Sequence, residues 1–399
     1  FSIGGGDVAM ALGLQNRTES LKENLDSLRS SGSSGRNITE AAISGSETTN
    51  SVFAEWQLPF TDDFEVQAAL RYEDFEQANV STTVPKISAR WNINDRLSVR
   101  GSWGESFQAP NILQTTTTIA TGTLQDSVNA SGSCVGIKNS GISNIVNVIS
   151  TGSDILEPQS ADAINLGIIL EPIDDLRLGL EYWSFDYQDL ITKGVSAQAK
   201  VINDCNDDGV ANDPSIQRAA NGIIRSVTTE FVNVGSVETD GLDLTFDYLL
   251  DSNIGEFKLG TVLSFVNSFD IIDSSGATDG VGSRNFLNSF RTIPELKFNT
   301  TFGWTRDAHQ ANLSLHYIDG YVNDANDEKV SSMTTVDLQY RYRFGEFFET
   351  SGSVLTLGVR NIFDRDPPSL GQGQRPGFDQ YTHDQRGRGI YASFTHTFQ

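Results

Sequence analysis

The segment Thr334–Phe344, TTVDLQYRYRF, alternates between apolar and polar side chains along most of its length. One set of alternate positions is apolar or aromatic, namely Val336, Leu338, Tyr340, Tyr342 and Phe344. The other set is polar or charged, namely Asp337, Gln339, Arg341 and Arg343. Because successive side chains on a strand point to opposite faces, the segment predicts a strand with one apolar and one hydrophilic face.

The same pattern recurs about fourteen times, with aromatic residues near the strand ends and charges on the opposite face. Further examples are Phe64, Val66, Ala68, Leu70 and Tyr72, and Ala311, Leu313, Leu315 and Tyr317. A soluble sandwich also has one wet face, so no single strand decides the fold class. The recurrence, with Tyr and Trp where membrane interfaces favour them, predicts an all-β fold: a transmembrane antiparallel up-and-down β-barrel.

The composition argues against two other classes of protein. Hydrophobic residues make up 38% of the 399 residues. No run approaches the ~20 consecutive apolar residues that a membrane-spanning helix needs. The formal net charge of −24 argues against a nucleic-acid partner, because phosphate backbones select basic surfaces.

The predicted connections alternate in length, which is a second and independent signal. The short ones are Pro59–Asp63, Asn92–Arg96, Glu171–Asp175, Asp251–Glu256, Arg306–Gln310 and Gly345–Gly352. The long ones are Thr18–Thr49, Gln108–Ser160, Ile191–Ser236, Asn267–Pro294, Ile318–Ser332 and Asp364–Arg388, and Glu73–Thr82 is intermediate. Membrane barrels have short periplasmic turns and longer extracellular loops, so the last strand, Gly389–Phe398, is predicted to run from outside to inside.

Two cysteines, Cys134 and Cys205, fall in long extracellular connections. They are either two unrelated free thiols or one disulfide between two loops, which an oxidising compartment would allow. The alternating connection lengths favour the disulfide.

Asp204, Asn206 and Asp208 match the start of a calcium-binding loop, D-x-[DN]-x-[DN]-G. The twelfth position is Ser215 rather than Glu, so the bidentate ligand is missing. A calcium ion in this extracellular loop is the functional hypothesis, and a solvated acidic loop is the alternative.

A candidate substrate surface lies in Leu176–Leu190. Leu176 to Tyr182 point alternate apolar side chains towards lipid, whereas Trp183, Phe185 and Tyr187 take the opposite phase, towards the lumen near the outer mouth. Binding pockets use aromatic surface with a few polar groups, so these rings are candidates for binding a large ligand. The alternatives are a bulge or an extension beyond the membrane. Weaker candidates near the same rim are Phe107, Arg284 and Tyr321.

No catalytic group is predicted. His309 and His396 are expected on the periplasmic side, His383 outside and His316 in the lumen, so no Ser/His/Asp set converges.

Several motifs resemble the C-terminal part of the TonB-dependent receptor barrels of Gram-negative outer membranes. Leu97–Asn111 resembles a family strand that ends in Phe-Arg-Ala-Pro, with Gln108 in place of Arg. Three other segments that resemble family motifs, in family order, are Glu157–Ile191, Asn233–Leu244 (with Asp243 in place of Glu) and Gly358–Pro368. The end, GRGIYASFTHTF, resembles the family's last strand, and Phe398 resembles the terminal aromatic residue that barrel-assembly machinery recognises, although Gln399 follows it.

The resemblance implies a barrel of twenty-two strands around a plug domain, and a short segment that engages TonB. It implies that residues 1–399 are the C-terminal portion of such a barrel, because no plug-like region is evident. The chain begins at Phe1 without a Met or a signal-peptide sequence of its own, so we expect either that the mature N-terminus starts here or that the chain is part of a longer polypeptide. The implied protein lies in outer-membrane lipid and lipopolysaccharide and is no enzyme. It takes up a scarce small-molecule nutrient with energy from TonB, most often a ferric siderophore, although cobalamin, haem and glycans are also used in the family and nothing in the sequence selects among them. The alternatives are a complete fourteen-stranded passive channel, with Val8–Leu14 pairing to Ile390–Phe398, and a barrel enzyme.

Overall fold

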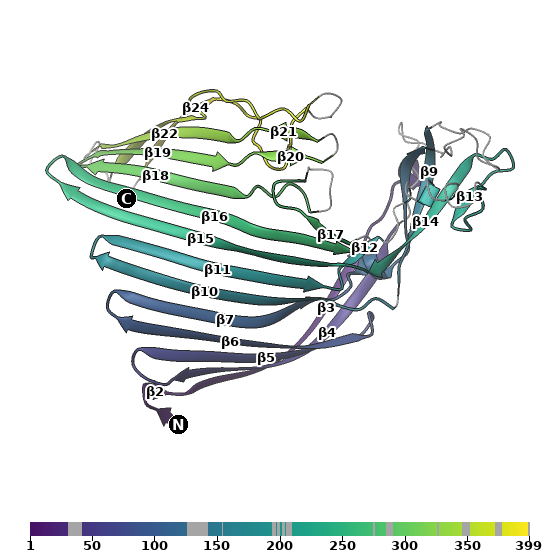
Figure 1. Cartoon of the computed structure of the whole chain (residues 1–399), viewed down its shortest axis with the longest axis horizontal. Coiled ribbons are helices and arrows are strands. Elements are labelled where there is room, and N and C mark those ends of the chain that lie inside the picture. Colours follow the sequence, from purple (N-terminus) through teal and green to yellow (C-terminus); the bar gives the residue numbers. More distant parts are fainter. Residues whose placement is uncertain are drawn as a thin grey trace.

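A computed structural model of the chain describes residues 1–30, 42–125, 143–153, 155–193, 197, 200–201, 204, 210–273, 276–284, 290–324, 327–344, 352–371 and 377–397. One large antiparallel sheet dominates it and curves like the wall of a barrel (Figure 1). No helix in these ranges is both long and apolar enough to cross a membrane.

The large sheet has fourteen strands on its main path through the described residues, as the alternating pattern predicted. In spatial order they are β3 (Ala9–Lys22), β4 (Ser44–Pro59), β5 (Phe64–Phe75), β6 (Val80–Asn94), β7 (Leu97–Gln108), β10 (Gln159–Ile173), β11 (Leu176–Gln188), β15 (Ser236–Ser252), β16 (Gly255–Asp273), β18 (Leu296–Arg306), β19 (His309–Ile318), β22 (Met333–Phe344), β23 (Ser353–Arg360) and β24 (Gly389–His396). A fifteenth strand, β17 (Gly276–Asp279), pairs with the end of β16. Each strand of the main path pairs with the next one along it, so the sheet is an up-and-down meander.

The short turns lie together at one edge of the sheet, at the left of Figure 1, and the long connections lie at the other edge. Several strands run further towards the long connections than the apolar alternation predicted. β16, for example, continues to Asp273, six residues past the predicted boundary at Asn267. Backbone hydrogen bonds between strands form in water as well as in lipid. The strands therefore continue beyond the last apolar residue of their outer face.

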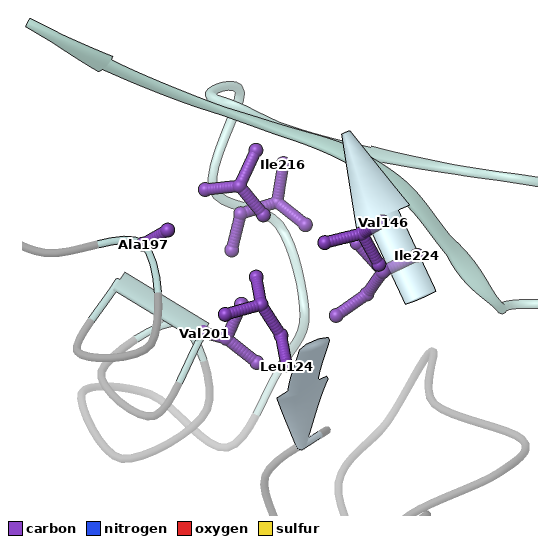
Figure 2. Packing of buried hydrophobic residues seen from close by; sticks show 7 residues of the cluster. Leu124, Val146, Ala197, Val201, Ile216 and Ile224 are labelled. Atoms are coloured by element: carbon purple, nitrogen blue, oxygen red, sulfur yellow. The ribbon is translucent and has the colours of Figure 1, made fainter. Parts of the chain in front are cut away.

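Two of the long connections fold together into a second sheet that the sequence reasoning missed. It contains β8 (Thr118–Gln125), β9 (Ser143–Thr151), β12 (Ile191–Lys193), β13 (Ile216–Arg218) and β14 (Ile224–Asn233). β9 and β14 come from different connections and pair in parallel. Their buried side chains meet Leu124, Ala197 and Val201 in a small core (Figure 2). The described parts of these two connections therefore form one folded unit beside the outer end of the wall.

The remaining elements are short. β1 (Ser2–Ile3) and β2 (Gly6–Asp7) pair near the N-terminus, and β20 (Tyr321–Asn323) pairs with β21 (Glu328–Val330) in the connection after β19. α1 (Ser27–Ser30) and α2 (Ile112–Thr115) are single helical turns. Asn111 caps α2: its side chain accepts from the backbone N–H groups of Leu113 and Gln114, which is the usual device for satisfying a helix start.

The wall has two chemically distinct faces, as predicted. Leu166, Leu180 and Leu244 lie on the outer face and are 55%, 45% and 40% exposed. Exposed apolar area of this extent marks a face that lipid covers. The inner face carries the charged residues. β3, which starts near the N-terminus at the bottom of Figure 1, and β24, near its top, are the two ends of the sheet path and do not pair with each other in the described residues.

Candidate functional site: an aromatic ridge at the outer rim

Three aromatic side chains form a ridge on the inner face of β11. The ring centroids of Trp183 and Phe185 are 5.8 Å apart, and those of Phe185 and Tyr187 are 6.0 Å apart. β11 pairs with β15 without a register shift from Leu176 to Tyr187. The bulge considered above is therefore absent, and the three rings share the face of the luminal Glu181.

Small side chains flank the ridge. On β10, Ala163 and Ala161 lie opposite Phe185 and Tyr187. One strand further, Gly104 and Ser106 of β7 continue the same two rows. The neighbours of Phe185 and Tyr187 on these two strands are therefore short side chains.

On the other side of the ridge, Gly241 of β15 lies opposite Trp183. A Cβ atom at this position would overlap the indole ring and the carbonyl oxygen of Phe265. The absence of a side chain at Gly241 therefore lets the Trp183 ring lie over β15, and any larger residue would displace it.

A pocket of about 480 Å³ opens at the outer end of the ridge. Its lining comes from five adjacent strands and two connections: Ser106, Phe107, Gln108, Gln159, Ser160, Ala161, Tyr187, Leu190, Val237, Phe269 and Phe290. The volume falls within the ~300–1,000 Å³ of small-molecule sites. Two of the six residues predicted to bind substrate, Phe107 and Tyr187, thus border one pocket. Sequence reasoning missed Phe269, Phe290 and Val237.

Phe107 is the second-last residue of β7 and lies opposite Ser160 of β10. Its ring meets that of Phe75 edge-on, with 5.7 Å between the centroids. It also borders a second cavity of about 500 Å³, which lies against Glu73 and Phe75 of β5.

Arg284 and Tyr321, the other two predicted residues, lie in a different cluster, built around Asp379. The Asp379 carboxylate is fully buried and accepts hydrogen bonds from the Thr292 hydroxyl (2.7 Å) and the Tyr321 hydroxyl (3.3 Å). Thr292 also donates to the Arg284 carbonyl oxygen (3.4 Å). Three connections that are far apart in sequence, after β16, β19 and β23, therefore meet at Asp379.

His383 completes this cluster, which we call the Asp379 cluster (Arg284, Thr292, Tyr321, Asp379 and His383). Its ring stacks on Tyr321, and its Nε2 atom lies 3.4 Å from the Tyr321 hydroxyl, while its Nδ1 atom is buried without a partner among the residues that the structure describes. No pattern in the sequence pointed to this convergence of His383 with an aspartate. Because Asp379 is inaccessible and His383 is 4% exposed, the cluster holds loops together rather than presenting a reactive group.

Burial sets the protonation states of this cluster. It raises the pKa of Tyr321, which the charge of Asp379 raises further, so the phenol stays neutral. Burial alone would raise the pKa of Asp379, but hydrogen bonds from Thr292 and Thr382 outweigh it and hold that pKa below its usual range. Burial also lowers the pKa of His383, an effect that Asp379 partly opposes.

Deeper in the wall, the inner face is charged. Arg90 pairs with Glu65 at 3.1 Å, and Arg100 pairs with Glu181 across the small Gly167. Together with Lys86 and Asn165 these residues line a pocket of about 450 Å³. The ridge therefore connects an apolar pocket at the rim to a charged one at membrane depth.

Of the residues predicted to bind calcium or to form a disulfide, the structure describes only Asp204. Asp204 is buried in the second sheet's core region, where its carboxylate accepts from the backbone N–H groups of Asn212 and Asp213 and pairs with Arg218 at 3.2 Å. Both of its oxygens thus already face donors, which fits a structural carboxylate. Asn206, Asp208, Cys134, Cys205, Phe398 and Gln399 lie outside the described residues. The calcium ion and the disulfide stay predictions, and no group of three His, Cys, Asp or Glu side chains suited to a metal occurs in the described ranges.

Known proteins resemble this chain over nearly its whole length. The family model described as "TonB dependent receptor-like, beta-barrel" matches residues 4–362. A probable TonB-dependent siderophore receptor, PirA of Acinetobacter baumannii, is 23% identical over 412 residues, which cover 98% of this chain and 48% of that protein.

Solved structures share the fold. The crystal structure of the siderophore receptor PirA from Acinetobacter baumannii has a TM-score of 0.65 at 17% identity, and covers 100% of this chain and 53% of its own. A mutant of the ferric enterobactin receptor PfeA from Pseudomonas aeruginosa has a TM-score of 0.67 at 17% identity, with 98% and 52% covered. The chain spans about half the length of these relatives. Its repeated two-faced strands, its meander of fourteen strands and the family match agree, and the chain belongs to the TonB-dependent receptor-like β-barrel family of the outer membrane.

Proposed function

We propose that the protein containing this chain takes up a ferric siderophore, or a similarly bulky iron complex, across the outer membrane with energy supplied through TonB. The relatives named siderophore receptors support the substrate class. Their family is one of receptors rather than enzymes.

The observation that carries the proposal is the luminal position of the ridge formed by Trp183, Phe185 and Tyr187. Aromatic surface that faced lipid would only anchor the barrel. On the inner face of an unbroken strand, at the edge with the long connections, the same rings meet a solute that enters from outside. Transport by a closed fourteen-stranded channel has less support, because β3 and β24 stand at opposite ends of the sheet. A plug domain, TonB, lipopolysaccharide and the barrel-assembly machinery complete the proposed partners.

Uptake of a radioiron-labelled ferric siderophore under iron limitation tests the proposal. Four strains are compared, with and without the gene and each with and without TonB. Uptake above background is expected only in the strain that has both. Trp183→Ala is expected to weaken the apparent affinity about threefold to tenfold, the worth of one aromatic contact.

The matched control is Trp91→Ala, which removes the same side chain from the outer face, where it is 52% exposed. It should leave uptake unchanged. Equal uptake with and without the gene, for catecholate, hydroxamate and carboxylate complexes alike, would refute the proposal.

A further inference from the structure

A single extra residue decides what the rim pocket contains. Along β16, Phe265 lies opposite Leu242 on the outer face, whereas Phe269 lies opposite Thr239 on the inner face. The alternation reverses at Asn267, where the pairing with β15 shifts by one residue. A bulge of this kind turns all later side chains to the other face, so it moves Phe269 from lipid into the pocket.

The bulge is held in place by a specific carboxylate. Asp240 accepts from the Asn267 side-chain amide at 3.1 Å and from the Ser268 hydroxyl. Phe290, from the connection after β16, then meets Phe269 edge-on, with 5.7 Å between the ring centroids. One wall of the pocket is therefore an aromatic pair that exists because of the bulge.

The rest of the lining named so far is also uncharged. Ala161 and Val237 are 5% and 2% exposed, and Tyr187 and Phe107 add two more rings to the Phe269–Phe290 pair. Four aromatic rings beside small and branched aliphatic residues suit a flat apolar group. Such a group gains by burial and by offset or edge-on ring contacts.

The polar groups of the pocket are neutral and mostly engaged. The Gln159 amide donates to the Gln108 side-chain oxygen at 3.0 Å and accepts from the Ile191 backbone N–H at 2.9 Å. None of the described lining residues carries a charge. An ionised group would lose its hydration here without a counter-charge, which is costly. A neutral group meets no such penalty.

We infer that this rim pocket binds an uncharged aryl group. The inference rests on the proposed function in one respect: the aryl group is taken to be part of the transported ligand, whose charged iron-binding part lies elsewhere, towards the charged wall of Arg100 and Glu181.

Two fragments of similar size test the inference without iron. N-benzylacetamide is neutral, and phenylacetate carries a carboxylate. Binding of each to the intact protein in lipid nanodiscs is measured by saturation-transfer NMR. Three proteins are compared: wild type, Ser106→Arg, which puts a cation in the pocket, and Ser98→Arg. Ser98 lies on the same strand and the same face, eight residues closer to the short turns, and outside the pocket. Band shift on unheated gels confirms that each barrel has assembled.

N-benzylacetamide should give at least a threefold stronger signal with wild type and Ser98→Arg than with Ser106→Arg. Phenylacetate should show no such loss of signal between wild type and Ser106→Arg. Equal N-benzylacetamide signals from all three proteins, or a phenylacetate signal on wild type that is stronger than the N-benzylacetamide signal, would overturn the inference. Iron uptake is measured separately. A protein that binds N-benzylacetamide but transports no ferric complex overturns the proposed function alone, and one that transports iron without fragment discrimination overturns the inference alone.

Discussion

Leu338 and Gln339 test the assignment of the two faces most directly. Leu338 lies five residues from Met333 and six from Phe344, the two ends of β22. At ~3.4 Å per residue and a tilt of about 45°, this places it roughly 12 Å along the membrane normal from the nearer end of β22, about half the height of an apolar band of ~25 Å, and so close to the midplane. Its direct neighbours across the sheet are Leu313 and Val359, so no polar group is at hand to receive a charge.

An arginine at position 338 is therefore expected to destabilise the folded barrel by about 2–4 kcal/mol, the midplane value for a cation on the lipid face. That corresponds to a folding constant lower by about 30- to 800-fold. At the next residue, the side-chain amide of Gln339 donates to the Tyr391 hydroxyl at 2.9 Å on the inner face. Arginine retains a donor there, so Gln339→Arg should cost less than about 1 kcal/mol.

Both variants are measured by urea titration of the intact protein refolded into lipid vesicles, with the folded fraction followed by gel mobility. The midpoint for Leu338→Arg should fall well below wild type, and that for Gln339→Arg should stay near it. Equal losses at the two positions, or the larger loss at Gln339, would mean that the faces are assigned the wrong way round.

Three further predictions concern the rim. Asp379→Ala removes the carboxylate that accepts from the buried Thr292 and Tyr321 hydroxyls, so hydrogen exchange of residues 280–284, 319–323 and 377–384 should speed up together, with a loss of protection of about 2 kcal/mol or more. His383 has a folded pKa below its unfolded value of about 6.5, so its contribution to loop stability is complete above that pH and is lost as the pH falls through the folded pKa. Protection of the same segments should therefore drop in mildly acidic buffer, and His383→Gln should flatten this dependence. Gly241→Leu should displace the Trp183 ring, at a cost of about 1–3 kcal/mol, and shift its fluorescence without changing that of the outward-facing Trp91.

The strands of the wall could be predicted because one physical rule governs all of them. Each strand faces lipid on one side and water on the other, so its sequence alternates with a period of two residues. The inner position of Trp183, Phe185 and Tyr187 follows from this alternation alone. The prediction held because β11 has no bulge. It did not extend to Phe269, because the predicted strand ended before Asn267, the residue at which the structure reverses the phase. A bulge leaves no clear mark in the alternation when the residues after it are mixed, as Ser268, Phe269 and Asp270 are.

The connections could not be predicted in the same way, because no solvent boundary imposes a period on them. Residues 223–233 carry a run of β-branched residues that does suggest a strand, and β14 forms there. Its parallel partner β9 lies in another connection, and only packing of the shared core selects that pairing. The meeting of Thr292, Tyr321 and Asp379 is of the same kind, since three loops without periodicity can be matched only in three dimensions.

The two free ends of the sheet separate the remaining hypotheses. A closed fourteen-stranded channel requires β3 to pair with β24, whereas the structure places them at opposite ends of the path. Without a further partner on its free side, β3 would present fourteen residues of unpaired backbone groups. Proteins avoid such an edge by pairing or covering it.

Cysteine cross-linking in outer membranes distinguishes the two cases, with Cys134 and Cys205 replaced by serine. Ala392→Cys is combined with Leu357→Cys, its direct neighbour on β23, as the positive control. It is then combined with cysteine at Met10, Leu12 or Leu14, which share its face. The first pair should oxidise readily, since a disulfide needs Cβ atoms about 4 Å apart, and the other three should not. A cross-link between β24 and any of the three β3 positions would show that these fourteen strands close on themselves, and the receptor assignment of function would then give way to the passive channel.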